Sequence, residues 1–519
     1  MTIDDGRTLL DPTAVAGGAA SAARPRASPI AESAVLAAGR VGAAAVAMVL
    51  PIALVRVLDP ASVGRYKLFF LIASTLGTLL SFGIPASLYY YVPRHPASRQ
   101  RMIATAIGLL VLAGLAGAVI IVSARPLLAT RFDLADHREV LLAALFTAVS
   151  IPAALLPVLA TTDGRVGLAS LAIAGFDVLR ATAMVSAALV FRRVDAVLAA
   201  AAAVMTLQLL ALGTYLVAQR KPAGPKEVKG THSVVRRQLG YAASYQGAIV
   251  ANLVREQAHA YYVAANVSTS AYAIYAVGLL QVPFLGAAAH SLNDVLIVHG
   301  SEMHGRGEID PLVSLWHRSA IALASVAFPV FVTLWLFAPD LFRVLFGATY
   351  GASVPVFRLS LLLQPLSVPL LHTMLRATGR TGAAARAEIV SLVVAVGSLP
   401  LLVHRVGPLG AVTSLVLASV AFQLTGSRVL LHELRRTPAT LLPWRSLASL
   451  LSAAVASAVG ARVLATPLPP VARLALGIPT SFAAYLCIAW RMGLVDAEDR
   501  ARLQARIARL SARWSDAHA

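Results

Sequence analysis

Long apolar stretches recur along the whole chain, and polar residues gather between them. A helix that crosses about 30 Å of hydrocarbon needs about 20 apolar residues. The stretches that reach or approach this length are Val35–Val57, Leu68–Val92, Met102–Val122, Val140–Leu159, Val166–Phe191, Val194–Val217, Tyr241–Val263, Tyr272–Val298, Ala320–Phe337, Val354–Leu375, Ile389–Val403, Leu409–Leu431, Leu447–Leu464 and Leu474–Trp490. The pattern predicts an all-α integral membrane protein with about 14 transmembrane helices.

Composition agrees with this pattern. The chain has 519 residues, of which 58% are hydrophobic and 13% are charged, whereas soluble domains carry about a quarter charged residues. Such a chain cannot cover a surface that faces water. The single cysteine, Cys487, lies in an apolar run, which excludes an intrachain disulfide and any cysteine-based zinc site.

The formal net charge of +20 has two explanations, nucleic-acid binding and membrane orientation. No basic stretch is interleaved with the aromatic residues on which bases stack, so we expect no nucleic-acid partner. With a cytoplasmic N-terminus, about 29 Lys and Arg residues fall on the inside and about 13 outside, as the positive-inside rule requires. Both termini are then predicted to be cytoplasmic.

The spans and their connections suggest a domain order. The expected segments are a flexible cytoplasmic tail (1–34), a first six-helix bundle (35–217), a basic cytoplasmic linker (218–240), a second six-helix bundle (241–431), two further helices (432–490) and an amphipathic cytoplasmic tail (491–519). A weak internal repeat supports two halves, because residues 59–66 and 268–275 each form a short turn of small residues that ends in a tyrosine. With six spans per half, the pseudo-symmetry axis would run along the membrane normal.

Short motifs at the ends of several spans carry a family resemblance. They are Arg56–Pro60, Gly64–Tyr66, Ala273–Tyr275, Leu345–Gly347, and Tyr350 with Pro355, Phe357 and Arg358. With these motifs, the chain from about residue 35 to 431 resembles bacterial polysaccharide flippases of the Wzx type. Those proteins belong to the multidrug/oligosaccharidyl-lipid/polysaccharide exporter superfamily. The motifs specify the superfamily better than the cargo.

The resemblance implies a MATE-like fold, with two six-helix bundles around a central cavity and two additional C-terminal helices. It also implies a function: movement of an undecaprenyl-pyrophosphate-linked oligosaccharide from the inner to the outer leaflet of the bacterial cytoplasmic membrane, for O-antigen, exopolysaccharide or capsule synthesis. The implied partners are the lipid-linked oligosaccharide, membrane lipids and the polysaccharide polymerase machinery. Family members often have an acidic residue midway along span seven, but residues 255–259 here read Arg-Glu-Gln-Ala-His, so that coupling role does not transfer directly.

Ionisable residues inside spans are the candidates for function, because they are costly in lipid. Span seven carries the clearest polar stripe at helical spacing, formed by Asn252, Arg255, Glu256, His259 and Tyr262. We interpret Asn252, Arg255, Glu256 and His259 as a cavity wall in which Arg255 attracts phosphate. The competing interpretation is a charged cluster that holds helices together.

Other candidates have similar alternatives. Asp177 and Arg180 lie three residues apart in span five, so the pair can neutralise itself, either as a structural contact or as a site of ion coupling. Arg40 in span one can catch pyrophosphate at the inner leaflet or extend to the interface. His290 and Asp294, one turn apart in span eight, can relay protons or form a packed polar contact.

Two other functions are open. One is export of a drug or a peptidoglycan precursor by another member of the superfamily. The other is a membrane-embedded glycan polymerase, ligase or acyltransferase, but the outer loops are short and hold no His/Asp/Glu constellation beyond Asp133, Asp136, His137 and Glu139. We therefore expect no enzyme. No cofactor or metal site is expected, and no phosphate-binding loop of the Walker type is present, so active transport would use a proton or sodium gradient.

Overall fold

The computed structural model describes residues 49–94, 98–219, 231–280 and 282–492. Within these ranges the chain is helical and contains no strand, which confirms the predicted all-α class. The predicted flexible tail, most of span one with Arg40, residues 220–230 of the basic linker and nearly all of the amphipathic C-terminal tail lie outside the described residues.

The first lobe contains the helices α2 to α9. They are α2 (Pro60–Leu80), α3 (Ile84–Arg94), α4 (Arg99–Ser123), α5 (Arg125–Phe132), α6 (His137–Ala153), α7 (Leu155–Thr162), α8 (Val166–Phe191) and α9 (Val194–Ala218). Local sequence sets several of their ends. Asp59 caps α2 by accepting a hydrogen bond from the Ser62 backbone, with Pro60 at the first position. The positive φ angles of Phe82 and Gly83 separate α2 from α3.

The second lobe follows a long helix, α10 (Thr231–Asn266). Its elements are α11 (Thr269–Gly278), α12 (Pro283–Gly305), α13 (Ile309–Leu345), η2 (Ala348–Ser353), α14 (Val354–Leu361), α15 (Leu363–Ser367), α16 (Leu371–Ala377), α17 (Thr381–Val406), α18 (Pro408–Glu433), α19 (Pro438–Leu441), α20 (Trp444–Leu464) and α21 (Pro470–Arg491). Four predicted spans are broken: span two between α2 and α3, span four between α6 and α7, span eight between α11 and α12, and span ten among α14, α15 and α16.

Eleven helical segments in the described ranges are long and apolar enough to cross a membrane. Three predicted spans are not among these eleven segments. They are span one, span seven, which is the more polar helix α10, and span eight, which is divided between α11 and α12. Several predicted spans began too late or ended too early, because the helix extends beyond its apolar run. The second span begins at Pro60 rather than Leu68, the ninth covers Ile309–Leu345, and the short eleventh is a helix of 26 residues, Thr381–Val406. Polar residues continue a helix past the apolar run because backbone hydrogen bonding does not stop at the edge of the hydrocarbon.

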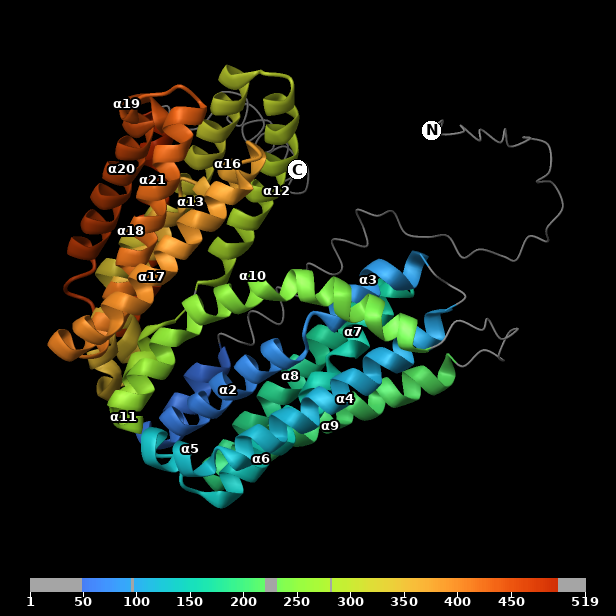
Figure 1. Cartoon of the computed structure of the whole chain (residues 1–519). Helices are drawn as coiled ribbons and strands as arrows, with labels where there is room; N and C mark the ends of the chain where they lie inside the picture. The colour runs from blue at the N-terminus through green and yellow to red at the C-terminus, as the bar shows by residue number, and fades with distance from the viewer. Residues whose placement is uncertain (1–48, 95–97, 220–230, 281, 493–519) are drawn as a thin grey trace, which may run out of the picture.

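The two lobes diverge in a V (Figure 1). They meet where α2, α5 and α11 lie together, and we call this the closed end; it carries Asp59, Asp133 and Thr269. The open end carries Arg99 and Asp163 in the first lobe and His304 and Glu433 in the second.

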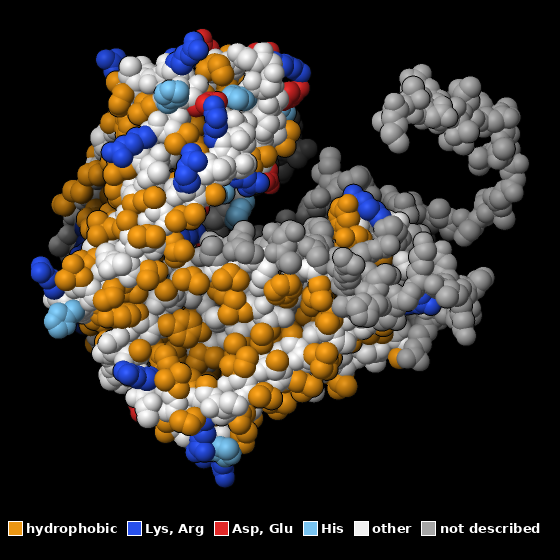
Figure 2. Space-filling model, in the orientation of Figure 1, with side chains coloured by type: hydrophobic (Ala, Val, Ile, Leu, Met, Phe, Trp, Pro, Cys, Tyr) orange, Lys and Arg blue, Asp and Glu red, His pale blue; other side chains and the backbone are white. Residues whose placement is uncertain are grey.

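Apolar side chains cover the outer flanks of both lobes (Figure 2). Large exposed examples come from both lobes and include Leu112, Leu171, Val190, Leu210, Val393 and Leu464. An apolar surface this wide is stable only against lipid. The finding agrees with a protein that crosses the membrane many times.

The last two long helices belong to the second lobe. Asp340 of α13 accepts a hydrogen bond from Arg473 of α21 at 2.8 Å and lies 3.3 Å from the Arg462 guanidinium of α20. Arg473 also donates to the backbone carbonyls of Ala465, Thr466 and Leu468. The helices α20 and α21 are thereby fixed to α13.

Candidate functional site

The helix α10 lies between the two lobes and contacts both. Gln238 and Gln246 donate to the backbone carbonyls of Met102 in α4 and Leu79 in α2, each at 3.1 Å. Nearer the closed end, Gln257 and the Tyr261 hydroxyl both contact Thr75 of α2, the latter at 2.7 Å. The polar stripe predicted on span seven therefore occupies the helix that joins the lobes (Figure 1).

Arg255 is the centre of a polar cluster on α10. Its Nη2 donates to Asn252 Oδ1 at 2.7 Å, and Glu256 and Glu388 of α17 lie 3.8 and 3.7 Å from the guanidinium. These two distances are too long for hydrogen bonds. Asn252 and Glu256 are exposed and the Arg255 side chain is 35% exposed, so part of its hydrogen-bonding capacity is free for a ligand.

The cluster extends onto α16 and α17, which the sequence interpretation missed. His372 of α16 lies within the electrostatic reach of Glu388, Arg376 and Arg255. His372 and Arg376 are both exposed. No pattern within one helix could have identified these residues, because α16 and α17 lie more than a hundred residues after α10 in the sequence.

The structure separates His259 from this cluster. Its side chain is only 8% exposed, and Nδ1 lies 2.6 Å from the Tyr275 hydroxyl of α11. In this arrangement His259 packs α10 against α11 rather than facing the other polar side chains of the stripe.

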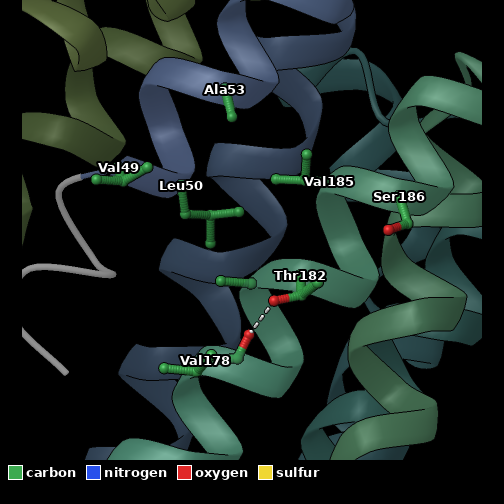
Figure 3. A pocket seen from close by; sticks show the side chains of 8 residues that line it. Val49, Leu50, Ala53, Val178, Thr182, Val185 and Ser186 are labelled. Carbon is green, nitrogen blue, oxygen red and sulfur yellow. Dashed lines mark hydrogen bonds between the residues drawn. The ribbon is translucent and has the colours of Figure 1, made fainter. Parts of the chain in front are cut away.

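Asp177 and Arg180 form the ion pair that their spacing indicates, at 2.6 Å within α8. Both side chains are about one third exposed. Next to them lies a cavity of about 410 Å³ between α8 and the described end of span one (Figure 3). Its lining is apolar, with Val49, Leu50, Val178 and Val185, and the Thr182 hydroxyl donates to the Val178 carbonyl within its own helix. The cavity suits a hydrocarbon group and not a sugar.

His290 and Asp294 are both exposed on α12. The described contacts contain no ion pair between them. Asn293, between them in the sequence, accepts a hydrogen bond from Thr373 of α16, and His290 and Asp294 remain accessible beside this contact. In Figure 1, α12 borders the space between the lobes.

Lys67 is a further candidate that the sequence interpretation missed. It lies two turns inside α2 and is half-buried. It makes no hydrogen bond or ion pair with any residue that the structure describes. Leu71, one turn further along α2, accepts a hydrogen bond from Tyr261 of α10, so this face of α2 is turned toward α10. The second predicted apolar run starts at Leu68, so Lys67 lies just outside it.

No protein-family model and no curated protein matches this sequence. Solved structures do match its fold. One is described as the lipid II flippase MurJ in an inward closed conformation, with 11% identity, a TM-score of 0.63, and coverage of 89% of this chain and 98% of that one. Two others are outward-facing and inward-facing conformations of a multidrug resistance MATE family transporter of the MOP superfamily, each 17% identical, with TM-scores of 0.51 and 0.54. They cover 79% and 75% of this chain and 97% and 95% of theirs. At this identity the likeness concerns the fold, and it confirms the predicted MATE-like architecture.

Proposed function

We propose that this protein is a flippase that moves a lipid-linked oligosaccharide, joined through pyrophosphate to undecaprenol, from the inner to the outer leaflet. The observation that carries the proposal is the pair of incompletely compensated cations, Arg255 on α10 and Lys67 on α2, on two helices that contact each other where the lobes meet. The proposal includes a bacterial cytoplasmic membrane with the open end facing the cytoplasm.

The physical difficulty in flipping a glycolipid lies in its headgroup. A sugar hydroxyl transferred into hydrocarbon without a partner costs about 4–8 kcal/mol, so an unaided headgroup would cost tens of kcal/mol. A polar path between two lobes lowers this cost, while the lipid tail can stay in the bilayer. The exposed residues of α10 and α12, including Asn252, His290 and Asp294, supply hydrogen-bonding groups for such a path.

The pyrophosphate needs cations whose charge is not already neutralised. An Arg guanidinium pairs with phosphate oxygens through two parallel hydrogen bonds, and a Lys ammonium acts as a point charge. Arg255 has one short hydrogen bond and two long ion pairs, and Lys67 has no described partner. Both can therefore accept an anionic group without first breaking a strong contact.

The V formed by the two lobes supports a transport cycle of alternating access. A V that is closed at one end admits a headgroup from the other end, and rocking of the lobes would release it on the opposite side. A proton or sodium gradient is the proposed drive, since one charge that crosses 100 mV supplies about 2.3 kcal/mol.

The alternative cargo is a peptidoglycan precursor. It is favoured by the solved lipid II flippase, whose match covers 89% of this chain, against 79% and 75% for the two MATE transporters. The wider coverage supports a lipid-linked cargo over a small drug. It does not distinguish one glycan from another.

Deletion of the gene followed by analysis of undecaprenyl-linked lipids tests both cargoes. Accumulated polysaccharide repeat units on the inner leaflet support the proposal, accumulated peptidoglycan precursor supports the alternative, and no accumulated lipid-linked glycan overturns both. Arg255→Ala should reproduce the deletion phenotype while the protein still inserts. Arg306→Ala is the matched control, because Arg306 lies at the open end in an exposed ion pair with Glu302. Normal export by Arg255→Ala would remove Arg255 from the site.

A further inference from the structure

A buried carboxylate lies at the closed end, apart from the proposed headgroup path. Glu139 is in the first turn of α6 and is 3% exposed. One of its oxygens, Oε1, lies 3.6 Å from Arg65 Nη1 of α2, and the other, Oε2, is buried without a hydrogen-bond partner in the described structure. A buried carboxylate that lacks hydrogen bonds is costly in its charged form.

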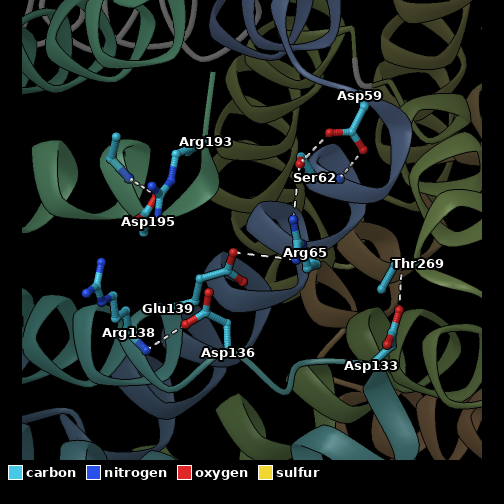
Figure 4. A network of polar contacts seen from close by, with 11 residues as sticks. Asp59, Ser62, Arg65, Asp133, Asp136, Arg138, Glu139, Arg193, Asp195 and Thr269 are labelled. Atoms are coloured by element: carbon cyan, nitrogen blue, oxygen red, sulfur yellow. Dashed lines mark hydrogen bonds and ion pairs between the residues drawn. The ribbon is translucent and has the colours of Figure 1, made fainter. Parts of the chain in front are cut away.

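Apart from Arg65, the charged groups near Glu139 are engaged with other partners (Figure 4). At the start of α9, Arg193 is engaged with Asp195, with Nε and Nη2 donating to its two oxygens at 3.1 and 2.7 Å. From α6 itself, Asp136 caps the helix through the Arg138 backbone N–H at 2.8 Å. The half of α4 that packs beside α6, residues 108–123, contains no ionisable residue.

The local charge balance is therefore negative. The charged groups at this place are three carboxylates and two guanidinium groups. The carboxylates are those of Asp136, Glu139 and Asp195, and the guanidinium groups are those of Arg65 and Arg193. A single proton on Glu139 neutralises the excess.

Arg65, the ion-pair partner of Glu139, lies next to the residue of α2 that contacts α11 at the closed end. Arg65 Nη2 also donates to Ser62 Oγ at 3.2 Å, and Ser62 Oγ donates to Asp59 Oδ2 at 2.6 Å. Gly64, which directly precedes Arg65, packs against the Thr269 backbone of α11. Thr269 Oγ1 in turn donates to Asp133 Oδ2 of the first lobe at 3.1 Å.

We infer that Glu139 is a proton-binding site, and that its protonation releases Arg65 and loosens the contact between α2 and α11. In the charged state, Glu139 holds Arg65 and the closed end stays shut. In the protonated state, Arg65 loses the Glu139 carboxylate as a partner and the lobes separate at this end. The link to transport rests on the proposed function, because it requires the two ends to open in alternation.

Distance measurements between spin labels test the site without any substrate. Cys487 is replaced by Ser, and labels are placed on the exposed residues Leu127 of the first lobe and Thr349 of the second, both at the closed end. Acidification should lengthen the distance between the labels in the wild type. Glu139→Gln, which mimics the protonated form, should give the long distance at every pH. Glu139→Asp should keep the response with a shifted midpoint.

Several outcomes would overturn the inference: a wild-type distance that does not change with pH, a Glu139→Gln variant that still responds like the wild type, or a response to sodium at constant pH. If Glu139→Gln does not fold, infrared spectroscopy of the wild type and Glu139→Asp replaces it. A band of a protonated carboxyl that appears on acidification and shifts in the Asp variant supports the site, and an unshifted band contradicts it. Arg255→Ala should keep the pH response while losing glycolipid transfer, so the two proposals fail separately.

Discussion

Gly64 of α2 and Thr269 of α11 bring the two lobes into backbone contact at the closed end. A Cβ atom built on Gly64 would lie 2.8 Å from the Thr269 carbonyl carbon and would collide with the carbonyl oxygen. A second contact supports the same closure, because Arg56 Nε donates to the Leu345 carbonyl at the end of α13 at 2.7 Å. The closed state therefore requires glycine at position 64.

Gly64→Ala should open the closed end. The added methyl group has no space against backbone atoms, so the lobes must separate or shift. The distance between spin labels at Leu127 and Thr349 should lengthen. Gly77→Ala in the same helix is the control, because its Cβ would lie 4.0 Å from Ile151, an ordinary contact. Equal distances in the two variants would show that Gly64 does not determine the closure.

Lys67→Ala should reduce glycolipid transfer at least tenfold in reconstituted vesicles, since it removes a cation without a described counter-charge from the face of α2 turned toward α10. Lys67→Arg should keep most of the activity, because it retains the charge. If Lys67→Ala transfers glycolipid at the wild-type rate, Lys67 is only a tolerated surface residue.

Tyr275→Phe should lower stability and leave transport unchanged. The change removes the hydroxyl 2.6 Å from His259 Nδ1, and a hydrogen bond between membrane helices contributes about 0.5–2 kcal/mol. Thermal unfolding in detergent measures the loss, and vesicle assays measure transport. A transport defect at wild-type stability would instead assign the pair to the functional site.

Arg473→Gln should destabilise the second lobe strongly. It leaves the buried Asp340 with only the more distant Arg462, and breaking a buried pair by removing one partner costs about 3–5 kcal/mol. The exposed pair of Arg306 and Glu302 offers a comparison, since Arg306→Gln should cost less than about 1 kcal/mol. Similar melting temperatures for both variants would contradict the role of Asp340 as an anchor for α20 and α21.

The Asp59 cap should give a pH-dependent contribution to stability. Burial raises the pKa of this carboxyl, but hydrogen bonds from the Ser62 side chain, the Ser62 and Ala61 backbone and the charge of Arg65 together outweigh burial, so the pKa lies below its ordinary value of 3.8. A lowered pKa means that the contribution is present above the pKa of the unfolded state and is lost as pH falls through that of the folded state.

Asp59→Ala should therefore cost about 0.5–2 kcal/mol near neutral pH, and this difference from the wild type should shrink below pH 3.8. Asp59→Asn retains a capping side chain without a titratable charge, so it is the matched control. Chemical unfolding at a series of pH values provides the measurement. A difference for Asp59→Ala that is constant with pH would show that the carboxylate charge has no part in the cap.

The sequence predicted the helical membrane class because the length of an apolar run is a local property. It also identified Asn252, Arg255 and Glu256 as neighbours, since helical spacing brings them together. It could not identify Glu388 as the ion-pair partner of Arg255, because that contact joins helices more than a hundred residues apart. His259 shows a related limit, since its spacing assigned it to the polar stripe but packing against Tyr275 buried it.

Length and polarity of successive stretches, together with the distribution of basic residues, determine by themselves that this chain lies in a membrane, how its helices alternate, and which side we expect to be cytoplasmic. Only the tertiary structure decided which face each helix buries, that Lys67 lies inside α2, and that Glu139 is enclosed with one oxygen unpaired. The physical reason is that lipid and protein interior are both apolar. A helix apolar on all sides carries no signal of which side meets its neighbours.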